Sequence, residues 1–421
     1  MTLDNAGAAR RLMARLDAFA EFTDEPGRLT RLYLSPSYRA ACVRFARWAD
    51  DLGLHPEIDA AGNVHARYEG KRPGAPALMI GSHIDTVRDA GKYDGNLGAL
   101  AGLAVIEQLA AAGERLDHAV DVVAFGDEEG VRFPTTMTGS RALAGLVSAS
   151  SLALKDADGV SLRDALAKFG SDPEKVLQLR ARGVAAFVEL HIEQGPVLEA
   201  EGLAIGVVGA INGATRLAVT VQGLAGHAGA VPMALRQDAL TASAEMILAI
   251  EARARAEIDL VATVGRIDAE PGAVNVIPGL VRFSVDVRSP RDEWRRRAVS
   301  DISVSLQAIA ARRGIKLVLA QTHEASAYVC DPRIVAGFDA ACVATGQKPF
   351  HLPSGAGHDT MIMGQVFSAG MLLVRCQVGI SHNPLESITP EDCEIALAAL
   401  TRFVRDFRPP AAGVFPPATE V

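Results

Sequence analysis

Histidine and aspartate residues stand where short apolar runs end, which is where protein metal ligands are commonly placed. The buried-type run 78–80 leads to His83, and Asp94 follows in the turn-forming segment 93–96. Imidazole and carboxylate on neighbouring loops could act as two ligands of one metal ion. Taken alone, the two residues are equally well explained as a hydrogen-bonded histidine near a strand end and an aspartate that caps a helix.

A second apolar run, 119–125, is followed closely by the adjacent carboxylates Glu128 and Glu129. Two such carboxylates are costly to hold together at the end of a buried strand unless a cation compensates them. Successive strand side chains point in opposite directions, so both can face one site only at a bend. Gly126 and Gly130 would provide that bend.

Two more histidines complete the set, because the strand-like run 187–192 contains His191 and the loop 379–384 contains His382. The candidate metal ligands are therefore His83, Asp94, Glu129, His191 and His382, with Glu128 unligated beside them. Imidazole and carboxylate donors without thiolate suit Zn²⁺, Mn²⁺ or Co²⁺. Asp85 shares a face with His83 in an extended chain, so its carboxylate would hold the imidazole in one tautomer.

Five motifs occur in order through nearly the whole chain: H-x-D-T-V, D-G-N-L-G, G-D-E-E-G-x-R-F, E-L-H-I-E-Q-G-P and S-H-N-P-x-E. They resemble motifs of the co-catalytic metal amidohydrolases, the family that includes allantoate amidohydrolase and N-carbamoyl-L-amino-acid hydrolase. The motif around His191 is the most specific, since related aminopeptidases and carboxypeptidases typically have a carboxylate there. The resemblance implies a cytoplasmic homodimer with two divalent metal ions per subunit, Mn²⁺ or Zn²⁺, with Co²⁺ or Ni²⁺ as alternatives.

The resemblance also implies roles for individual residues. Asp94 would bridge the two metals, one also held by His83 and His191 and the other by Glu129 and His382. Glu128 would be the general base. The matching substrate contacts are Gln194, His227, Asn275, Arg288, Gly357 and His358. Arg288 would pair with a substrate carboxylate, and His227 would stabilise the oxyanion, reaching in from the partner subunit. Without the resemblance, His227, Asn275 and Arg288 would be interpreted as a surface histidine, a turn asparagine and a solvated arginine.

The sequences of an amino-terminal segment, R-L-T-R-L-Y-L, and of a segment near residue 212, A-I-N-G-A-T-R-L, look most like those of allantoate amidohydrolases. Those enzymes convert allantoate to ureidoglycine, ammonia and carbon dioxide. Segments 212–215 and 230–231 depart from the family's usual Gln/Arg-rich and Thr-Thr sequences, which keeps N-carbamoyl-L-amino-acid hydrolase as the alternative. A dipeptidase or aminopeptidase is the more remote alternative.

Positioning these residues requires a layered framework. Buried strand-like runs alternate with helical segments through about residue 210, which predicts an α/β domain with a central mixed sheet flanked by helices. The resemblance implies that this domain is of the dinuclear-zinc exopeptidase type. The order β-α-β-β-α-β over 212–324, with its second strand at 260–267, predicts an inserted ferredoxin-like α+β domain that serves as a lid or dimerisation domain. The catalytic domain would then comprise 1–211 and 325–421. Residues 148–182 are expected to be helical, and a frayed tail is expected from Pro409.

Composition sets the outer bounds. The chain has 421 residues, 49% of them hydrophobic and 22% charged, with a net charge of −8. This charge argues against a nucleic-acid or anionic-membrane partner and leaves a small-molecule substrate as the expected one. The five cysteines show no C-x-x-C pair, which favours reduced thiols in the cytoplasm. The amino terminus lacks the apolar core of a secretory signal, and no apolar stretch approaches the roughly 20 residues of a membrane span.

Overall fold

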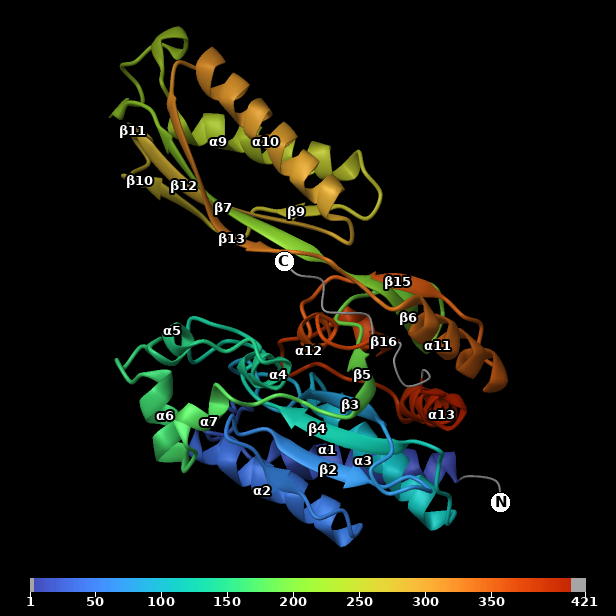
Figure 1. The fold of residues 1–421 in the computed structure, drawn as a ribbon. Helices are drawn as coiled ribbons and strands as arrows, with labels where there is room; N and C mark the ends of the chain where they lie inside the picture. The colour runs from blue at the N-terminus through green and yellow to red at the C-terminus, as the bar shows by residue number, and fades with distance from the viewer. Residues whose placement is uncertain (1–3, 410–421) are drawn as a thin grey trace. The chain divides into compact units, whose positions relative to one another are not determined.

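The computed structural model describes residues 4–409 and divides the chain into two compact units (Figure 1). The first comprises Met1–Gly209, Cys330–Leu352 and His358–Val421, and the second comprises Ala210–Val329 and Pro353–Gly357. The insert expected at 212–324 thus lies inside the second unit, whose observed bounds are slightly wider. Beyond Pro409 itself, the tail expected from that residue on lies outside the described residues.

The first unit is built on a mixed sheet with the strand order β1-β2-β4-β3-β5-β16-β6. β3 runs parallel to β4 and β5, and β5 runs parallel to β16, whereas β2 and β6 pair antiparallel with β4 and β16. The predicted mixed central sheet is therefore confirmed. Its strands are β1 (Glu57–Ile58), β2 (Val64–Tyr68), β3 (Ala77–His83), β4 (Ala119–Phe125), β5 (Val184–Ile192), β6 (Ile205–Ile211), β15 (His351–Ser354), which pairs with β6, and β16 (Ala369–Val374).

Helices cover both faces of this sheet, with α1, α2 and α3 on one side and α4 and α12 on the other (Figure 1). α3 packs closely on β3, β4 and β5 because its glycines bring the backbones together: a Cβ on Gly98 would lie 2.0 Å from the carbonyl oxygen of Leu190. The helices are α1 (Asn5–Ala20), α2 (Pro36–Asp51), α3 (Asn96–Ala111), α4 (Thr138–Ala144), α5 (Ala149–Leu152), α6 (Leu162–Phe169), α7 (Pro173–Val176), α8 (Val197–Ala200), α11 (Pro332–Ala344), α12 (Asp359–Met363), α13 (Pro390–Asp406) and the 3₁₀ turn η2 (Gln377–Gly379).

Four neighbouring parallel strands, β4, β3, β5 and β16, end at the same edge of the sheet. β3, β5 and β16 are buried along their whole length, and His83 and His191 lie at or near the ends of two of them. In open α/β sheets, ligands bind outside the carboxyl ends of parallel strands. The segments that follow His83, Phe125, Ile192 and Val374 are therefore the expected site.

The second unit is an antiparallel sheet with the order β10-β12-β7-β13, in which β9 also pairs with β12. α9 and α10 pack together over the face that carries the buried residues Val219, Val221, Val281 and Val285. This arrangement is the predicted ferredoxin-like unit. Its elements are β7 (Gly213–Gln222), β8 (Gly226–His227), η1 (Met233–Leu235), α9 (Ala239–Arg255), β9 (Val261–Thr263), β10 (Ile267–Glu270), β11 (Val276–Ile277), β12 (Leu280–Ser289), α10 (Asp292–Arg312), β13 (Lys316–Ala325) and β14 (Tyr328–Val329).

Two local predictions need correction. The strand expected over 260–267 is broken into β9 and β10, with Gly265 in the break, as expected for a residue that weakens strands. Residues 148–182 contain three short helices joined by loops and turns, because Ser148, Ser161 and Asp172 each cap a new helix start.

All five cysteines lie within the described residues, and each is buried and unpaired. None of the helices between residues 4 and 409 is long and apolar enough to cross a membrane.

Candidate metal centre

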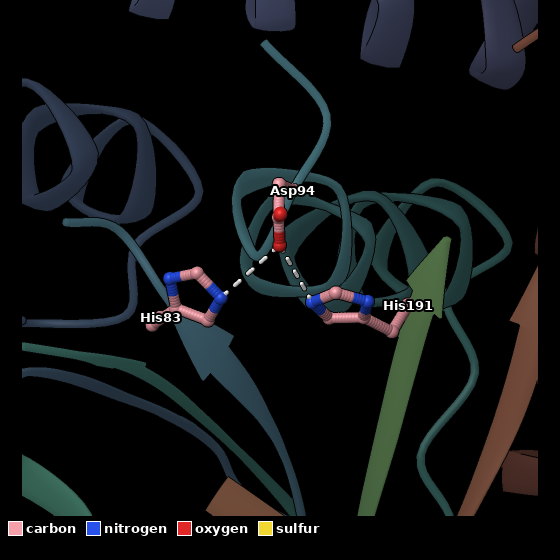
Figure 2. A group of neighbouring side chains, drawn as sticks. All are labelled: His83, Asp94 and His191. Carbon is pink, nitrogen blue, oxygen red and sulfur yellow. Dashed lines mark ion pairs between the residues drawn. The ribbon is translucent and has the colours of Figure 1, made fainter. Parts of the chain in front are cut away.

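Two histidines from adjacent strands converge on one aspartate (Figure 2). His83 ends β3 and His191 lies near the end of β5, and Asp94 precedes α3. Asp94 Oδ1 lies 3.4 Å from Nε2 of His83 and 3.1 Å from Nε2 of His191. All three side chains are buried. Gly95, not Asp94, is the residue before the first helical turn of α3, so helix capping does not explain this aspartate.

Backbone contacts fix the orientation of both imidazoles. Nδ1 of His83 donates to the carbonyl oxygen of Asp85 at 3.0 Å, and Nδ1 of His191 donates to the carbonyl oxygen of Ile192 at 2.9 Å. Each ring therefore turns its Nε2 towards Asp94. Gly95 is required beside His83, because a Cβ there would lie 2.4 Å from the imidazole and its φ is +66°.

The second oxygen of Asp94 faces another pair of candidate ligands. His382 Nε2 lies 3.3 Å from Asp94 Oδ2 and 3.7 Å from Glu129 Oε2. Asp94 is thus common to two sets of three possible ligands, one with His83 and His191 and one with Glu129 and His382. This shared carboxylate is the arrangement of a bridging ligand between two cations.

Burial and the close approach of carboxylates and histidines shift the pKa values of the groups in the cluster. Burial and the charge of Asp94 raise the pKa of Glu129 to about 7. Burial raises the pKa of Asp94, but hydrogen bonds from the three histidines outweigh it and hold that pKa well below its ordinary value. Burial lowers the pKa of His83, but Asp94 and Glu128 raise it well above its ordinary value. Positive charge between these groups is therefore strongly favoured.

Glu128 lies beside the cluster with its side chain near His83 and Glu129. Burial, together with nearby carboxylates, raises its pKa well above the ordinary value, which suits a group that accepts and returns a proton. The bend that brings both glutamates to one side arises at Asp127, with φ of +64°, and at Gly130, with φ of +62°. Gly126 has a different role from the one predicted: a Cβ there would lie 2.2 Å from the hydroxyl of Tyr38.

The predicted contact between the carboxylate of Asp85 and His83 is not present. Asp85 Oδ1 lies 3.9 Å from Nδ1 of His83, too far for a hydrogen bond, and the backbone carbonyl of Asp85 makes the contact instead. The Asp85 carboxylate accepts the backbone N–H groups of Glu128 at 3.1 Å and Glu129 at 3.3 Å. β3 ends at His83, so the alternation of an extended strand does not continue to Asp85.

Gln194, predicted as a substrate contact, joins the ligand cluster. Its Nε2 donates to Asp94 Oδ2 at 2.8 Å and to Ser381 Oγ at 3.2 Å, and its φ is +58°. Ser381 also donates to Asp94 Oδ2 at 2.9 Å. Oxygen Oε1 of Gln194 is buried without a hydrogen-bond partner among the described residues.

The residues of the cluster fit two divalent cations. The imidazoles of three histidines and the carboxylates of Asp94 and Glu129 lie close together, and the donors include no thiolate. Glu129 Oε1 is buried with no hydrogen-bond partner in the described part of the chain, as expected of an oxygen that binds a cation. Such a donor set suits Zn²⁺ or Mn²⁺.

The other predicted substrate residues fall in two places. His358 lies in the first unit, buried, with its ring centroid 4.4 Å from that of His191. His227, Asn275, Arg288 and Gly357 belong to the second unit. There, β8 pairs with β11 and the N–H of Ala228 donates to the carbonyl of Asn275 at 2.9 Å, which brings His227 next to Asn275.

Arg288 extends from β12 towards the segment that contains Gly357. Its Nη1 donates to the carbonyl of Gly355 at 2.9 Å, and its Nε and Nη2 contact Asp286 at 2.9 and 3.1 Å. The ionised Asp286 raises the pKa of Arg288, so the guanidinium stays charged.

Sequence inspection missed two groups that hold the ligand loops. The fully buried Arg31 donates to the carbonyls of Phe19, Phe22 and Ile84 and to the side chain of Asn96. Glu386 accepts the backbone N–H groups of Tyr93 and Asp94. Glu386 was visible as the last residue of S-H-N-P-x-E, whereas nothing local distinguishes Arg31, since its acceptors Ile84 and Asn96 lie more than fifty positions away.

Comparison with known proteins agrees with this geometry. Residues 79–406 match the model of peptidase family M20/M25/M40. Allantoate deiminase of Arabidopsis thaliana is 40% identical over 93% of this chain and 81% of its own length. N-carbamoyl-L-amino acid amidohydrolase of Geobacillus stearothermophilus is also 40% identical, over 93% of this chain and 96% of its own length. The crystal structure of an amidase of the hydantoinase/carbamoylase family from Burkholderia multivorans superposes with a TM-score of 0.90 at 34% identity, covering 94% of this chain and 97% of that one.

The chain has a mixed α/β unit with His, Asp and Glu side chains gathered at its parallel strand ends, and an inserted antiparallel domain. Together with its relatives, this makes it a metal-dependent amidohydrolase. The M20 family implies a dinuclear metal site, with which the buried cluster is consistent. The chain belongs to peptidase family M20/M25/M40, in the hydantoinase/carbamoylase amidohydrolase group.

Proposed function

We propose that this protein hydrolyses a ureido C–N bond of allantoate, releasing ureidoglycine, ammonia and carbon dioxide. The observation that carries the proposal is the pair of ligand sets that share Asp94. Glu128 lies beside them, near His83 and Glu129, and is assigned here as the base and not as a ligand. Relatives called allantoate deiminase, from Arabidopsis thaliana and Glycine max, are 38–40% identical over almost the whole chain.

The cations would be held by His83, Asp94 and His191 at one position and by Asp94, Glu129 and His382 at the other. When bound, they would lower the pKa of a water molecule to about 7 and polarise the substrate carbonyl. A carboxylate oxygen of Glu128 takes the proton from the attacking water and delivers it to the leaving nitrogen. Its raised pKa supports both halves of that transfer. Asp85 and Glu386 hold the backbone from which these groups project.

Substrate recognition is assigned to the second unit and to His358 and Gln194. The Nε and Nη2 contacts with Asp286 hold the Arg288 guanidinium in place, and a substrate carboxylate would bind to the remaining N–H groups on Nη1 and Nη2. Asn275 supplies amide donors, and Gly357 supplies a backbone N–H. His227 stabilises the oxyanion that develops on the attacked carbonyl, a contribution worth about 10²–10³ in rate for one donor.

N-carbamoyl-L-amino-acid hydrolysis is the second candidate. Relatives with that activity in their names reach 40% identity, the same as the plant enzymes. Both substrate classes present a carbamoyl group and a carboxylate, so the ligand cluster and Arg288 serve either. The difference lies in whether the pocket accepts a second ureido group or an amino-acid side chain.

The test is ammonia release by the Mn²⁺-loaded protein, with allantoate and a series of N-carbamoyl-L-amino acids assayed in parallel. A higher kcat/KM for allantoate supports the proposal, and a higher value for a carbamoyl amino acid replaces it with the second candidate. Release of amino acids from dipeptides, with neither carbamoyl substrate turned over, would contradict both.

The proposal includes a homodimer in which His227 acts in the partner's site. His227 is exposed on a two-residue strand, and the exposed apolar side chains of Leu224 and Met233 flank it in sequence, while exposed Val274 lies just before β11, the strand that pairs with it. Mixing a His227→Ala variant with a Glu128→Gln variant tests this arrangement, because mixed dimers would regain one intact site. Activity that stays at the level of the separate variants, although mixed dimers form, would rule it out.

A further inference from the structure

Glu386 is a buried carboxylate four residues after His382, and each of its oxygens has a defined donor. Oε1 accepts the backbone N–H groups of Tyr93 at 2.9 Å and Asp94 at 3.0 Å. Oε2 lies 2.9 Å from Oγ of Ser381, whose single hydroxyl proton can be donated either to this oxygen or to Asp94 Oδ2. The carboxylate is 4% exposed, so water does not compete strongly for these hydrogen bonds.

These hydrogen bonds join two loops that are nearly 300 positions apart in sequence. One loop carries Asp94, and the other carries His382. The loops are in tight contact, since a Cβ on Gly91 would lie 2.3 Å from Cβ of Glu386. Ser381 lies between the two carboxylates, at 2.9 Å from Asp94 Oδ2 as well as from Glu386.

The ligands of the two candidate cation positions are not held equally rigidly by the surrounding structure. His83 and His191 project from strands of the central sheet, and their Nδ1 atoms are fixed by backbone carbonyls. His382 lies in a loop, its side chain is 52% exposed, and its φ of +54° is uncommon for a residue other than glycine. Surrounding contacts must therefore hold this loop in place.

We propose that Glu386 is a positioning residue that fixes the distance between Asp94 and His382 and thereby sets the affinity of the cation position that they share with Glu129. The inference rests on the proposed function, because it assumes two bound cations. Glu386 touches neither substrate nor cation; it acts through the backbone of Asp94 and the hydroxyl of Ser381. Replacing the outer partners of metal ligands typically costs about 10–100-fold in metal affinity.

The test is Zn²⁺ titration of the apo protein in competition with a chromophoric chelator, for the wild type, Glu386→Gln and Ser381→Ala. Glu386→Gln keeps the size of the side chain but removes its charge and one acceptor. We expect one of the two binding events to weaken by about 10–100-fold and the other to stay within about threefold. Ser381→Ala leaves both backbone hydrogen bonds to Glu386 intact and should weaken the same Zn²⁺-binding event by a smaller factor. It provides the test if Glu386→Gln does not fold. Glu201→Gln, at an exposed glutamate, is the charge-matched control and should bind as the wild type does.

Thermal unfolding in excess chelator separates positioning from general support of the fold: the proposal expects the apo forms of wild type and Glu386→Gln to unfold within about two degrees of each other. Two binding events of wild-type affinity in Glu386→Gln, or equal weakening of both, would overturn the inference while leaving the proposed function intact. A wild-type protein that binds fewer than two Zn²⁺ ions per chain would instead contradict the proposed function.

Discussion

The side chain of Asp85 accepts a hydrogen bond from the backbone N–H of Glu128 at 3.1 Å, which ties the loop after β3 to the loop after β4. Its other oxygen accepts the N–H of Glu129 at 3.3 Å. One carboxylate therefore orients the backbone of both adjacent glutamates, while its own carbonyl holds His83. Asp85 acts on the proposed base and on two ligands at once.

Asp85→Asn should lower kcat by about 10–100-fold, the usual effect of losing a partner that orients metal-site residues. An amide can accept one of the two N–H groups, but it turns its own NH₂ towards the other. Steady-state kinetics with metal analysis of the same preparation would measure this. Asp50→Asn, at an exposed aspartate of α2, is the control and should leave kcat unchanged. A wild-type kcat in Asp85→Asn would contradict the assigned role.

Glu128→Gln and Glu129→Gln should fail in different ways, although the two residues are adjacent. Glu128→Gln should keep both cations and lose about 10²–10⁴ in kcat, because only the proton transfer is removed. Glu129→Gln should lose a cation, because a neutral amide replaces a ligand oxygen. Metal stoichiometry and kcat, measured together, distinguish the two. Substantial turnover by fully loaded Glu128→Gln would exclude it as the base.

His118 makes the stability of the fold depend on pH. Burial lowers its pKa from 6.5 to about 4, and its ring packs edge-on against Phe407 at 5.2 Å between centroids. Between these pH values the unfolded chain binds more protons than the folded one, so stability is present above about pH 6.5 and is lost as the pH falls towards 4. The loss should reach at most about 3 kcal/mol. Thermal unfolding of apo protein across this range should be less pH-dependent in His118→Phe; an unchanged profile would contradict the assignment.

Arg31→Lys should reduce the free energy of unfolding by about 2–4 kcal/mol, because a lysine cannot reach four acceptors and leaves buried carbonyls unpaired. The guanidinium also lies over the ring of Phe19, with Cζ 4.5 Å from the ring centroid. Urea unfolding of apo protein measures the change. Arg28→Lys, on an exposed side chain, should alter stability by no more than about 0.5 kcal/mol. Equal effects of the two substitutions would show that Arg31 is not a structural anchor.

The apolar runs 78–80, 119–125 and 187–192 predicted three central strands of the first unit, and the order of elements over 212–324 predicted the ferredoxin-like second unit. The residue types of the ligand cluster were predicted from sequence motifs, whereas β6, β15 and β16 were not predicted. Apolar runs and alternation follow from backbone geometry, so elements such as β3, α3 and β12 can be read locally. His83, Asp94, Glu129, His191 and His382 could be identified because each stands at a strand end or loop within a recognisable motif.

The hydrogen-bond partners that orient the ligand loops could not be predicted from the sequence and became evident from the packing of the elements. The carboxylate of Asp85 contacts the glutamate loop because β3 and β4 are neighbours in the sheet, a pairing that alternation along one strand cannot reveal. Glu386 reaches the backbone of Asp94, and Arg31 reaches Ile84 and Asn96, across long sequence separations. Such contacts depend on how the elements pack together, and local sequence patterns specify the elements without specifying that packing.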